Sequence, residues 1–116
     1  MKKKHKILIV DDEKELLNLF KNELGELFFV ITSPSVRMAI KTLETVNVDL
    51  VVWDYLLADG NGIEVRDYLK VNRKDIPSIC ITGSDVLDHK LGCKVFRKPI
   101  NMPKHINSIK NLLQHK

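Results

Sequence analysis

Five short apolar runs, separated by segments with helical periodicity, constrain the fold of this chain more than any other feature of its sequence. The runs cover residues 7–10, 28–32, 48–53, 78–82 and 94–97. Most of them are continuously apolar, which is typical of strands in a parallel sheet covered on both faces. Right-handed crossovers then place helices on both sides of the sheet. The pattern predicts an α/β fold, a single doubly wound (βα)5 domain spanning residues 1–116.

The segments between the runs carry helix signals. We expect the first helix over residues 12–26, with one apolar stripe made of Leu16, Leu17, Phe20, Leu24 and Leu27. Residues 33–35, Ser-Pro-Ser, open a second helix with a capping residue and an early proline. Residues 59–62 form a turn cluster that begins with Asp59, and residues 63–71 predict a third helix. Residues 84–91 allow about two helical turns, so the fourth helix is short. The terminal helix has apolar positions at Met102, Ile106, Ile109, Leu112 and Leu113.

Length and composition exclude several classes of protein. The chain has 116 residues, and its 5 glycines and 4 prolines are too few for a collagen-like or disordered chain. No apolar run approaches the roughly 20 residues that cross a bilayer. Only residues 7–10 are apolar after the basic start, which is too few for a signal peptide. With Cys80 and Cys93 in no CxxC motif, we expect a cytoplasmic protein and no membrane association.

The charge of the chain is unevenly distributed. The net charge is +4, yet residues 89–116 contain seven basic residues and no acid, while residues 7–88 contain all fifteen acids. A basic quarter of this kind could bind nucleic acid, but no aromatic platform or recognition helix accompanies it, so a solvated basic face is favoured and direct nucleic-acid binding is disfavoured. An acidic protein partner is as plausible as nucleic acid. We expect the four histidines on surface segments, and none has the spacing of a zinc ligand.

Polar residues stand at the ends of four predicted strands. In strand order they are Asp11 and Asp12, Asp54, Thr82 and Gly83, and Lys98 and Pro99. Taken singly, each has an ordinary structural explanation as a capping, turn or loop residue. In a doubly wound sheet, however, the carboxyl ends of the strands meet at one edge, where ligands bind. The sequence therefore predicts three carboxylates, a hydroxyl and an ammonium group in one cleft.

That set of groups predicts a particular chemistry. Clustered carboxylates repel one another unless a cation lies among them, and Mg²⁺ prefers such hard oxygen ligands. Lys98 and Thr82 are suitable donors to a phosphoryl group. An aspartate beside the cation can act as a nucleophile and hold an acyl phosphate.

The same residues resemble the receiver domain of two-component response regulators, the CheY-like family. The resemblance rests on four motifs in the family's order: ILIVDDE at 7–13, VDLVVWD at 48–54 with Gly62 eight residues later, ICITG at 79–83, and FRKP at 96–99. It covers essentially the whole chain. It implies a five-stranded sheet of flavodoxin-like order 2-1-3-4-5 in a bacterial, cytoplasmic signalling switch that catalyses only its own phosphorylation and dephosphorylation.

The resemblance also implies a role for each site residue. Asp54 would accept a phosphoryl group from a histidine kinase or phosphotransfer protein. Mg²⁺ would be bound by Asp12 and Asp54 directly, by Asp11 through water, and by the Leu56 carbonyl. Thr82 and Gly83 with Lys98 and Pro99 would form the phosphate-binding and switch region. Phosphorylation would then alter the face over residues 84–110, to which a downstream protein partner binds. The resemblance also allows a homodimer.

Three departures from the family pattern lie near that output face. The frequent Met-Pro after the acceptor is Leu57-Ala58 here, which predicts a looser loop. Val95 replaces the usual switch aromatic, and Phe96, one residue on, is expected to point to the opposite face of the sheet. Only 15 residues separate Thr82 from Lys98, which shortens the fourth helix. The chemistry is therefore expected to be retained while the output route is unusual.

Other readings of the sequence stay open to different degrees. A pseudo-receiver, which docks a partner without phosphorylation, is the main alternative. A haloacid dehalogenase-type phosphatase needs a second acid two residues after the nucleophile, where this chain has Leu56. A flavodoxin-like cofactor protein is disfavoured because no Gly- or Ser/Thr-rich phosphate loop follows the first strand.

Overall fold

Five parallel strands form the central sheet of the computed structural model, which describes residues 4–83 and 91–114. The strands are β1 (Lys6–Val10), β2 (Phe29–Ser33), β3 (Leu50–Asp54), β6 (Ser78–Thr82) and β7 (Lys94–Arg97). Their order in the sheet is β2-β1-β3-β6-β7. This order confirms the predicted 2-1-3-4-5 arrangement, in which the chain reverses direction across the sheet between β1 and β3.

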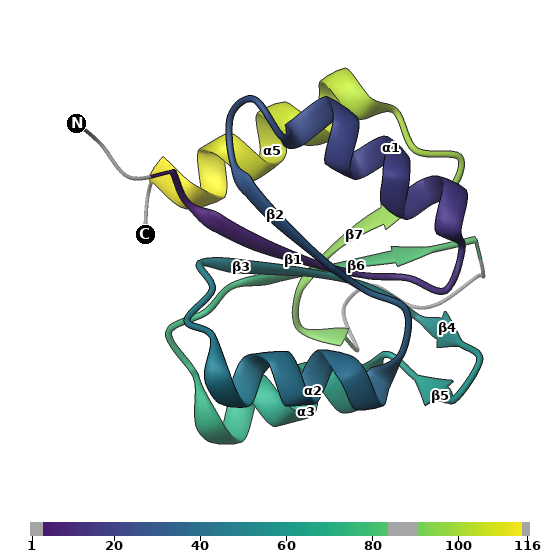
Figure 1. Cartoon of the computed structure of the whole chain (residues 1–116), viewed down its shortest axis with the longest axis vertical. Coiled ribbons are helices and arrows are strands. Elements are labelled where there is room, and N and C mark those ends of the chain that lie inside the picture. Colours follow the sequence, from purple (N-terminus) through teal and green to yellow (C-terminus); the bar gives the residue numbers. More distant parts are fainter. Residues whose placement is uncertain (1–3, 84–90, 115–116) are drawn as a thin grey trace.

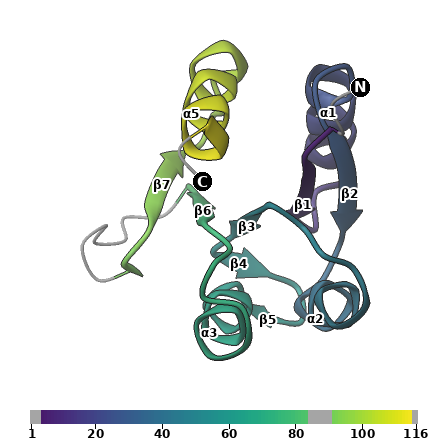
Figure 2. The same cartoon turned by 90° about the vertical axis from the view of Figure 1, so that its left-hand side faces the viewer.

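Two pairs of helices cover the two faces of the sheet (Figures 1 and 2). The helices are α1 (Lys14–Leu24), α2 (Val36–Thr45), α3 (Ile63–Asn72) and α5 (Met102–Gln114). Figure 1 shows α1 and α5 above the sheet and α2 and α3 below it. The short fourth helix predicted near residues 84–90 lies outside the described residues. In the part of the chain described, no helix is both long and apolar enough to cross a membrane.

Each face of the sheet has its own hydrophobic core. Ile7, Ile9 and Val52 point toward α1 and α5, where Phe20 and Ile109 are completely buried. The alternate residues of the same strands point toward α2 and α3, and these include Trp53, which is also completely buried. Because successive side chains of a strand point to opposite faces, continuously apolar strands supply both cores.

The helix boundaries follow local signals. Helix α1 ends at Leu24, before Gly25, so the predicted stripe is correct through Leu24 and wrong at Leu27, which is 45% exposed. Helix α2 begins after Ser35, whose hydroxyl accepts a hydrogen bond from the Met38 backbone N–H at 3.1 Å. That bond satisfies one of the unpaired N–H groups at the helix start, as the sequence predicted.

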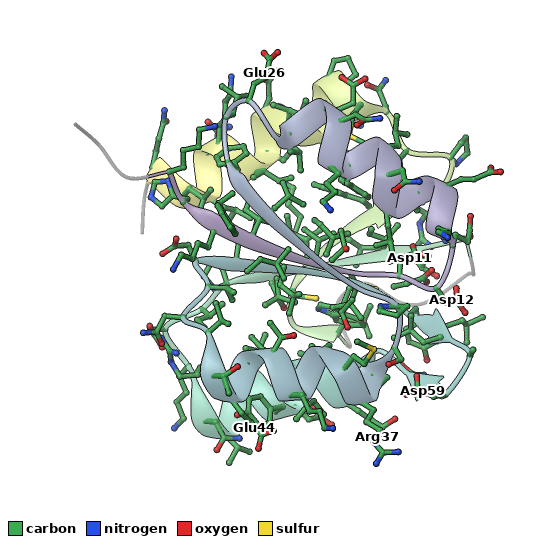
Figure 3. The ribbon with its side chains drawn as sticks, in the orientation of Figure 1. Asp11, Asp12, Glu26, Arg37, Glu44 and Asp59 are labelled. Atoms are coloured by element: carbon green, nitrogen blue, oxygen red, sulfur yellow. The ribbon has the colours of Figure 1, made fainter. Side chains whose placement is uncertain are left out.

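A small antiparallel hairpin, which the sequence suggested only as a turn, follows the third strand. Its strands are β4 (Leu56–Leu57) and β5 (Gly60–Asn61). At its tip Asp59 accepts hydrogen bonds from the Val36 and Arg37 backbone N–H groups at 3.0 and 3.1 Å. These bonds and the positive end of the α2 dipole hold the pKa of Asp59 below its ordinary value. The hairpin is thereby attached to α2 beside the carboxyl end of β3 (Figure 3).

Candidate functional site

The sheet brings Asp11 and Asp54 together. Asp11 directly follows β1, Asp54 ends β3, and the two strands pair with Val10 opposite Trp53. One carboxylate oxygen from each of Asp11, Asp12 and Asp54 lies within 4.8 Å of the others. The predicted cluster of three acids at the carboxyl edge of the sheet is therefore present, between the first and third strands.

The three acids differ in their surroundings. Asp11 is completely buried and Asp54 is 5% exposed, whereas Asp12 is exposed. The backbone N–H of Glu13 donates to Asp11 Oδ1 at 2.7 Å, and that of Leu56 donates to Asp54 Oδ1 at 3.1 Å. These backbone bonds fix the orientation of both buried carboxylates and leave one oxygen of each directed toward Lys98.

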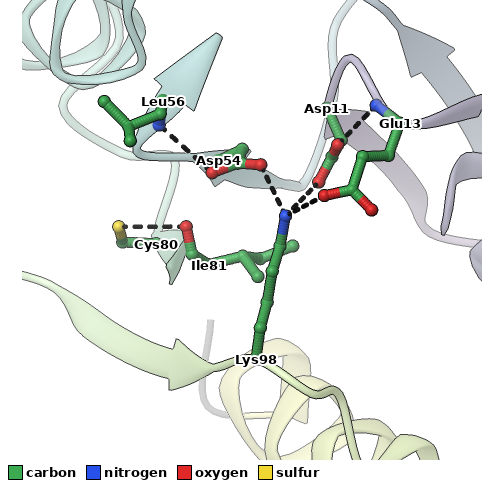
Figure 4. Close-up of polar contacts among 7 residues, drawn as sticks. All are labelled: Asp11, Glu13, Asp54, Leu56, Cys80, Ile81 and Lys98. Carbon is green, nitrogen blue, oxygen red and sulfur yellow. Dashed lines mark hydrogen bonds and ion pairs between the residues drawn. The ribbon is translucent and has the colours of Figure 1, made fainter. Parts of the chain in front are cut away.

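Lys98 extends from the end of β7 into the acid cluster (Figure 4). Its Nζ lies 2.8 Å from Asp54 Oδ2, 2.8 Å from Glu13 Oε1 and 3.5 Å from Asp11 Oδ2. Burial disfavours the ammonium form, but hydrogen bonds to Asp54 and Glu13 and the charges around it outweigh burial and raise the pKa of Lys98. Lys98 therefore stays charged and partly neutralises the cluster.

One ammonium group does not balance three or four carboxylates. Burial raises the pKa of Asp11 to about 7, and the negative charge of Asp54 acts in the same direction against the Glu13 N–H and Lys98. Near neutral pH the cluster therefore holds a carboxyl group that releases its proton readily when a further cation arrives. The unbalanced charge is an electrostatic reason for this pocket to bind metal.

The residues fit a magnesium ion. The donors are carboxylate oxygens, the hard ligands that Mg²⁺ prefers, and they come from two strand ends that are adjacent in the sheet. Among the described residues, none forms a hydrogen bond with the buried Asp11 Oδ2, although Lys98 Nζ lies 3.5 Å away. A buried carboxylate oxygen without a hydrogen bond destabilises the fold unless a ligand, such as a metal ion, binds to it.

The other predicted site residues lie at the same edge. Thr82 is buried at the end of β6, and its carbonyl accepts a hydrogen bond from the Lys98 N–H at 2.9 Å. Gly83 follows it, and a Cβ there would meet only Lys98 Cβ, at 3.9 Å. The Lys98–Pro99 peptide bond is cis. The structure therefore brings these four residues together, while their roles toward phosphate remain predictions.

The glycine eight residues after Asp54 has a steric reason. A Cβ on Gly62 would lie 1.9 Å from the Asp54 carbonyl oxygen and 2.7 Å from Trp53 Cε3. The Gly62 N–H also donates to the Tyr55 carbonyl at 2.9 Å. The loop after the acceptor strand therefore returns so closely to β3 that only glycine fits. Leu56, within that loop, is 59% exposed beside the acid cluster.

The departure at Val95 is visible in the packing of β7. Phe96 is 2% exposed and packs in the core with α1 and α5, whereas Val95 is half-buried and packs against the opposite core. This confirms the prediction that Phe96 points away from the side of Val95. Phe96 stacks on His105 with ring centroids 3.7 Å apart. The prediction that all four histidines lie on surface segments is wrong for His105, which is 6% exposed.

Sequence reasoning missed two polar contacts. It noted Glu13 only as the residue after the acidic pair, yet Glu13 Oε1 bonds Lys98 Nζ across the site. It assigned Asp59 to a turn without its contact to α2. Neither contact has a local sequence signal, because Asp59 lies 22 and 23 residues from its partners and Glu13 lies 85 residues from Lys98.

Comparisons with known proteins agree with this geometry. A family model, described as the response regulator receiver domain, matches residues 7–110. The chain is 32% identical over 109 residues to the alkaline phosphatase synthesis transcriptional regulatory protein PhoP of Bacillus subtilis, covering 89% of this chain and 45% of that protein. It is 37% identical over 84 residues to the heme response regulator HssR of Staphylococcus aureus, covering 72% and 37%. The chain thus spans less than half the length of these relatives.

Solved structures give the same result. The receiver domain of a LuxO repressor protein from Vibrio parahaemolyticus superposes with a TM-score of 0.89 at 24% identity, covering 97% of this chain and 92% of that one. The response regulator TrrA of Thermotoga maritima, solved in complex with Mg²⁺–BeF, has a TM-score of 0.83 at 27% identity, covering 93% and 98%. The motifs, the sheet order and these matches together show that the chain belongs to the response regulator receiver domain family.

Proposed function

We propose that residues 1–116 form a receiver domain in which Asp54 accepts a phosphoryl group from a histidine kinase or phosphotransfer protein. One observation carries the proposal: Asp54 is buried at a strand end with Lys98 Nζ 2.8 Å from its Oδ2 and two further aspartates within 4.8 Å. An aspartate with a purely structural role does not require neighbouring acids and an ammonium group. A site for phosphoryl transfer requires both, because catalysis there consists mainly of positioning and charge stabilisation.

Each side chain has a distinct part in the transfer. A carboxylate oxygen of Asp54 attacks phosphorus, a new O–P bond forms, and the bond from phosphorus to the donor nitrogen or oxygen breaks. The Leu56 N–H holds Asp54 Oδ1, so the carboxylate is oriented before the donor arrives. Lys98 compensates the charge on the phosphoryl oxygens, and the Thr82 hydroxyl bonds another of them.

Asp11, Asp12 and Asp54, with the Leu56 carbonyl, would hold Mg²⁺ in this site. When bound, Mg²⁺ supplies positive charge that stabilises the phosphoryl oxygens and positions them. Asp11 Oδ2, which accepts no hydrogen bond from the described residues, and the raised pKa of Asp11 support this assignment.

The two cysteines, present as thiols, support a cytoplasmic setting for the protein.

The signal would leave through the face that includes β7 and α5. Movement of Thr82 toward the phosphoryl group biases a two-state region, and a downstream protein binds one of the two states. The structure of the relative NtrC4 is that of a beryllofluoride-activated receiver dimer, so we include a homodimer among the forms of the output. Val95 supplies no aromatic ring to follow Thr82, so the coupling would differ from the usual one.

The test is labelling by acetyl phosphate, read by intact mass spectrometry. The native chain should gain one phosphoryl group in the presence of Mg²⁺ and none with a chelator. Asp54→Asn should abolish labelling, whereas Asp67→Asn, at an exposed aspartate on α3, should leave it unchanged.

Two results would contradict the proposal. Labelling that persists in Asp54→Asn would show that another residue is the acceptor. A chain that is folded by circular dichroism, binds neither Mg²⁺ nor beryllofluoride in calorimetry, and is never labelled would instead be the docking-only pseudo-receiver.

A further inference from the structure

A second concave site lies at the opposite end of the strands from the acid cluster. It is a groove of about 440 Å³ between the C-terminal half of α3 and the amino ends of β6 and β7. Ser78 and Lys94, the first residues of those strands, line the groove, whereas Thr82 and Lys98 lie at or just beyond the other ends. In Figure 2, α3, β6 and β7 lie on one side of the molecule, away from α2 and β2. The groove shares no residue with the phosphoryl site.

The rim of the groove is cationic. Among the described residues, five basic side chains and no acid line it: Arg66, Lys70, Arg73, Lys74 and Lys94. Arg66 and Lys70 lie four residues apart, so they project from the same side of α3. Arg73 and Lys74 follow directly after the end of α3 at Asn72, and Lys94 lies on β7.

Part of this charge is already balanced and part is not. Arg66 pairs with Asp67 at 2.8 Å and Arg73 pairs with Asp75 at 3.3 Å. Within residues 4–83 and 91–114, no ion pair holds Lys70, Lys74 or Lys94. Among the described residues, an acidic ligand would therefore be the first close partner of these three lysines.

The floor of the groove is apolar and well supported. Leu69, Ile76 and Leu91 are each 3–6% exposed and form its base, with Pro77 and Leu112 beside them. Arg66 Nη1 bonds the Leu91 carbonyl at 2.8 Å, so the wall formed by residues 91–94 is tied to α3. A volume of about 440 Å³ falls within the range of sites that take an apolar group.

We propose that this groove is a docking site for an acidic segment of a partner protein that carries apolar side chains. The apolar floor would accept a leucine or phenylalanine, while carboxylates on either side would pair with the lysines of the rim. A small anion would reach only one or two of these charges, and a nucleic-acid backbone has no apolar side chain for the floor.

The experiment uses three short fluorescein-labelled peptides and a labelled single-stranded oligodeoxynucleotide, with binding followed by fluorescence anisotropy. The first peptide alternates Asp and Glu with Leu and Phe. The second has Ser in place of the apolar residues, and the third has Gln in place of the acids. Only the first should bind well, and amide chemical shifts of the ¹⁵N-labelled chain should change at residues 66–78 and 91–94.

Charge reversal of the rim gives the matched comparison. The double variant Lys70→Glu/Lys74→Glu should bind the first peptide about tenfold more weakly. The control Lys21→Glu/Lys41→Glu makes the same charge change on α1 and α2, and Lys21, like Lys70, lies in the last turn of its helix. The control should bind as the native chain does. All three proteins should bind beryllofluoride alike, which reports on folding and on the separate phosphoryl site.

Several results would overturn the proposal. Equal binding of the first peptide by both double variants would show that the groove is not its binding site. Chemical-shift changes confined to residues of β7 and α5 outside the groove would show the same. Equal binding of the Ser-containing peptide would reduce the groove to a charged surface. Tighter binding of the oligonucleotide would make it a nucleic-acid site. Sedimentation of the chain alone as a dimer that Lys70→Glu/Lys74→Glu dissociates would make it a self-association surface.

Discussion

The end of β3 and the middle of β7 are separated by a single strand, yet their surroundings constrain them very differently. All five residues of β3 are buried, and Gly62 lies directly against the Asp54 carbonyl. In β7, at the edge of the described sheet, only Phe96 is buried, and its ring stacks on His105. The strand that ends in Asp54 is thus enclosed on both faces, whereas β7 is buried mainly on the face of Phe96, with Val95 half-buried on the other.

The difference bears on one departure of this chain from its family, the one at Val95. A Cβ at Gly62 would meet backbone atoms, which cannot move aside, so the loop after Asp54 tolerates no larger residue at that position. Along β7, substitutions at exposed and half-buried positions change the folding stability little, and Val95 is at such a position. We therefore expect chemistry and output to respond separately to mutation, and four measurements test that contrast.

The largest effect is expected within β7 itself. Phe96→Ala removes a buried ring and its stacking on His105, and should lower the free energy of unfolding by about 4 kcal/mol. Val95→Ala, one residue away and half-buried, should lower it by less than about 1.5 kcal/mol. Urea denaturation followed by circular dichroism measures both. Similar losses for the two variants would mean that β7 is held equally from both faces.

The second effect tests the enclosure of β3. Gly62→Ala places a Cβ against the Asp54 carbonyl and the Trp53 ring, and should cost about 3 kcal/mol. Gly83→Ala is the matched control, since its Cβ would make only an ordinary contact with Lys98, and it should cost less than about 1 kcal/mol. The same denaturation experiment applies. A small loss for Gly62→Ala would show that the loop after Asp54 yields easily.

The third effect is a pH dependence of the acid cluster. The pKa of Asp11 is about 7 in the folded chain against 3.8 as its reference, so between these values the folded state binds more protons than the unfolded state. Stability without metal should therefore fall as pH rises from about 4 to about 7. Asp11→Asn should flatten this part of the profile, and Mg²⁺ should no longer stabilise that variant. An unchanged profile in Asp11→Asn would contradict the assignment.

The fourth and smallest effect has the opposite sign. Burial, together with the charges of Lys104 and Lys94, lowers the pKa of His105 below 6.5, so the unfolded state binds more protons as the medium becomes acidic. Stability carried by His105 should therefore decrease as pH falls below about 6.5. Comparing His105→Phe with Asp11→Asn across pH 5–8 separates the two contributions. If stability depended on pH in the same way in His105→Phe and in the native chain, a contribution from His105 would be ruled out.

The sequence predicted the sheet well for identifiable reasons. The bounds of β6 and β7 are those expected from residues 78–82 and 94–97, because apolar residues are flanked there by Pro77 and by Lys98-Pro99. The convergence of Asp11, Asp12 and Asp54 followed from parallel topology alone, since the carboxyl ends of such strands share one edge. Both inferences depend on local patterns and a general rule of connection.

The failures concern contacts that no local pattern records. Leu27 continues the helical period but follows Gly25, where α1 has ended, so it is exposed. His105 had a usable signal, because it lies three residues after Met102 and four before Ile109, on the buried side of α5. The predicted buried side of the terminal helix included apolar residues only, so the burial of His105 was not predicted. The bond from Glu13 to Lys98 depends on the full three-dimensional arrangement and could not be inferred.

The loop from Tyr55 to Gly62 acts as a spacer of fixed length. One end is joined to the other by the bond from the Gly62 N–H to the Tyr55 carbonyl, and its tip is bound to the start of α2 through Asp59. An inserted or deleted residue would have to break one of these attachments or push Gly62 into β3. Among natural variants of this chain, changes in length should therefore accumulate in other connections, and the interval between acceptor and glycine should persist even where the residues within it differ.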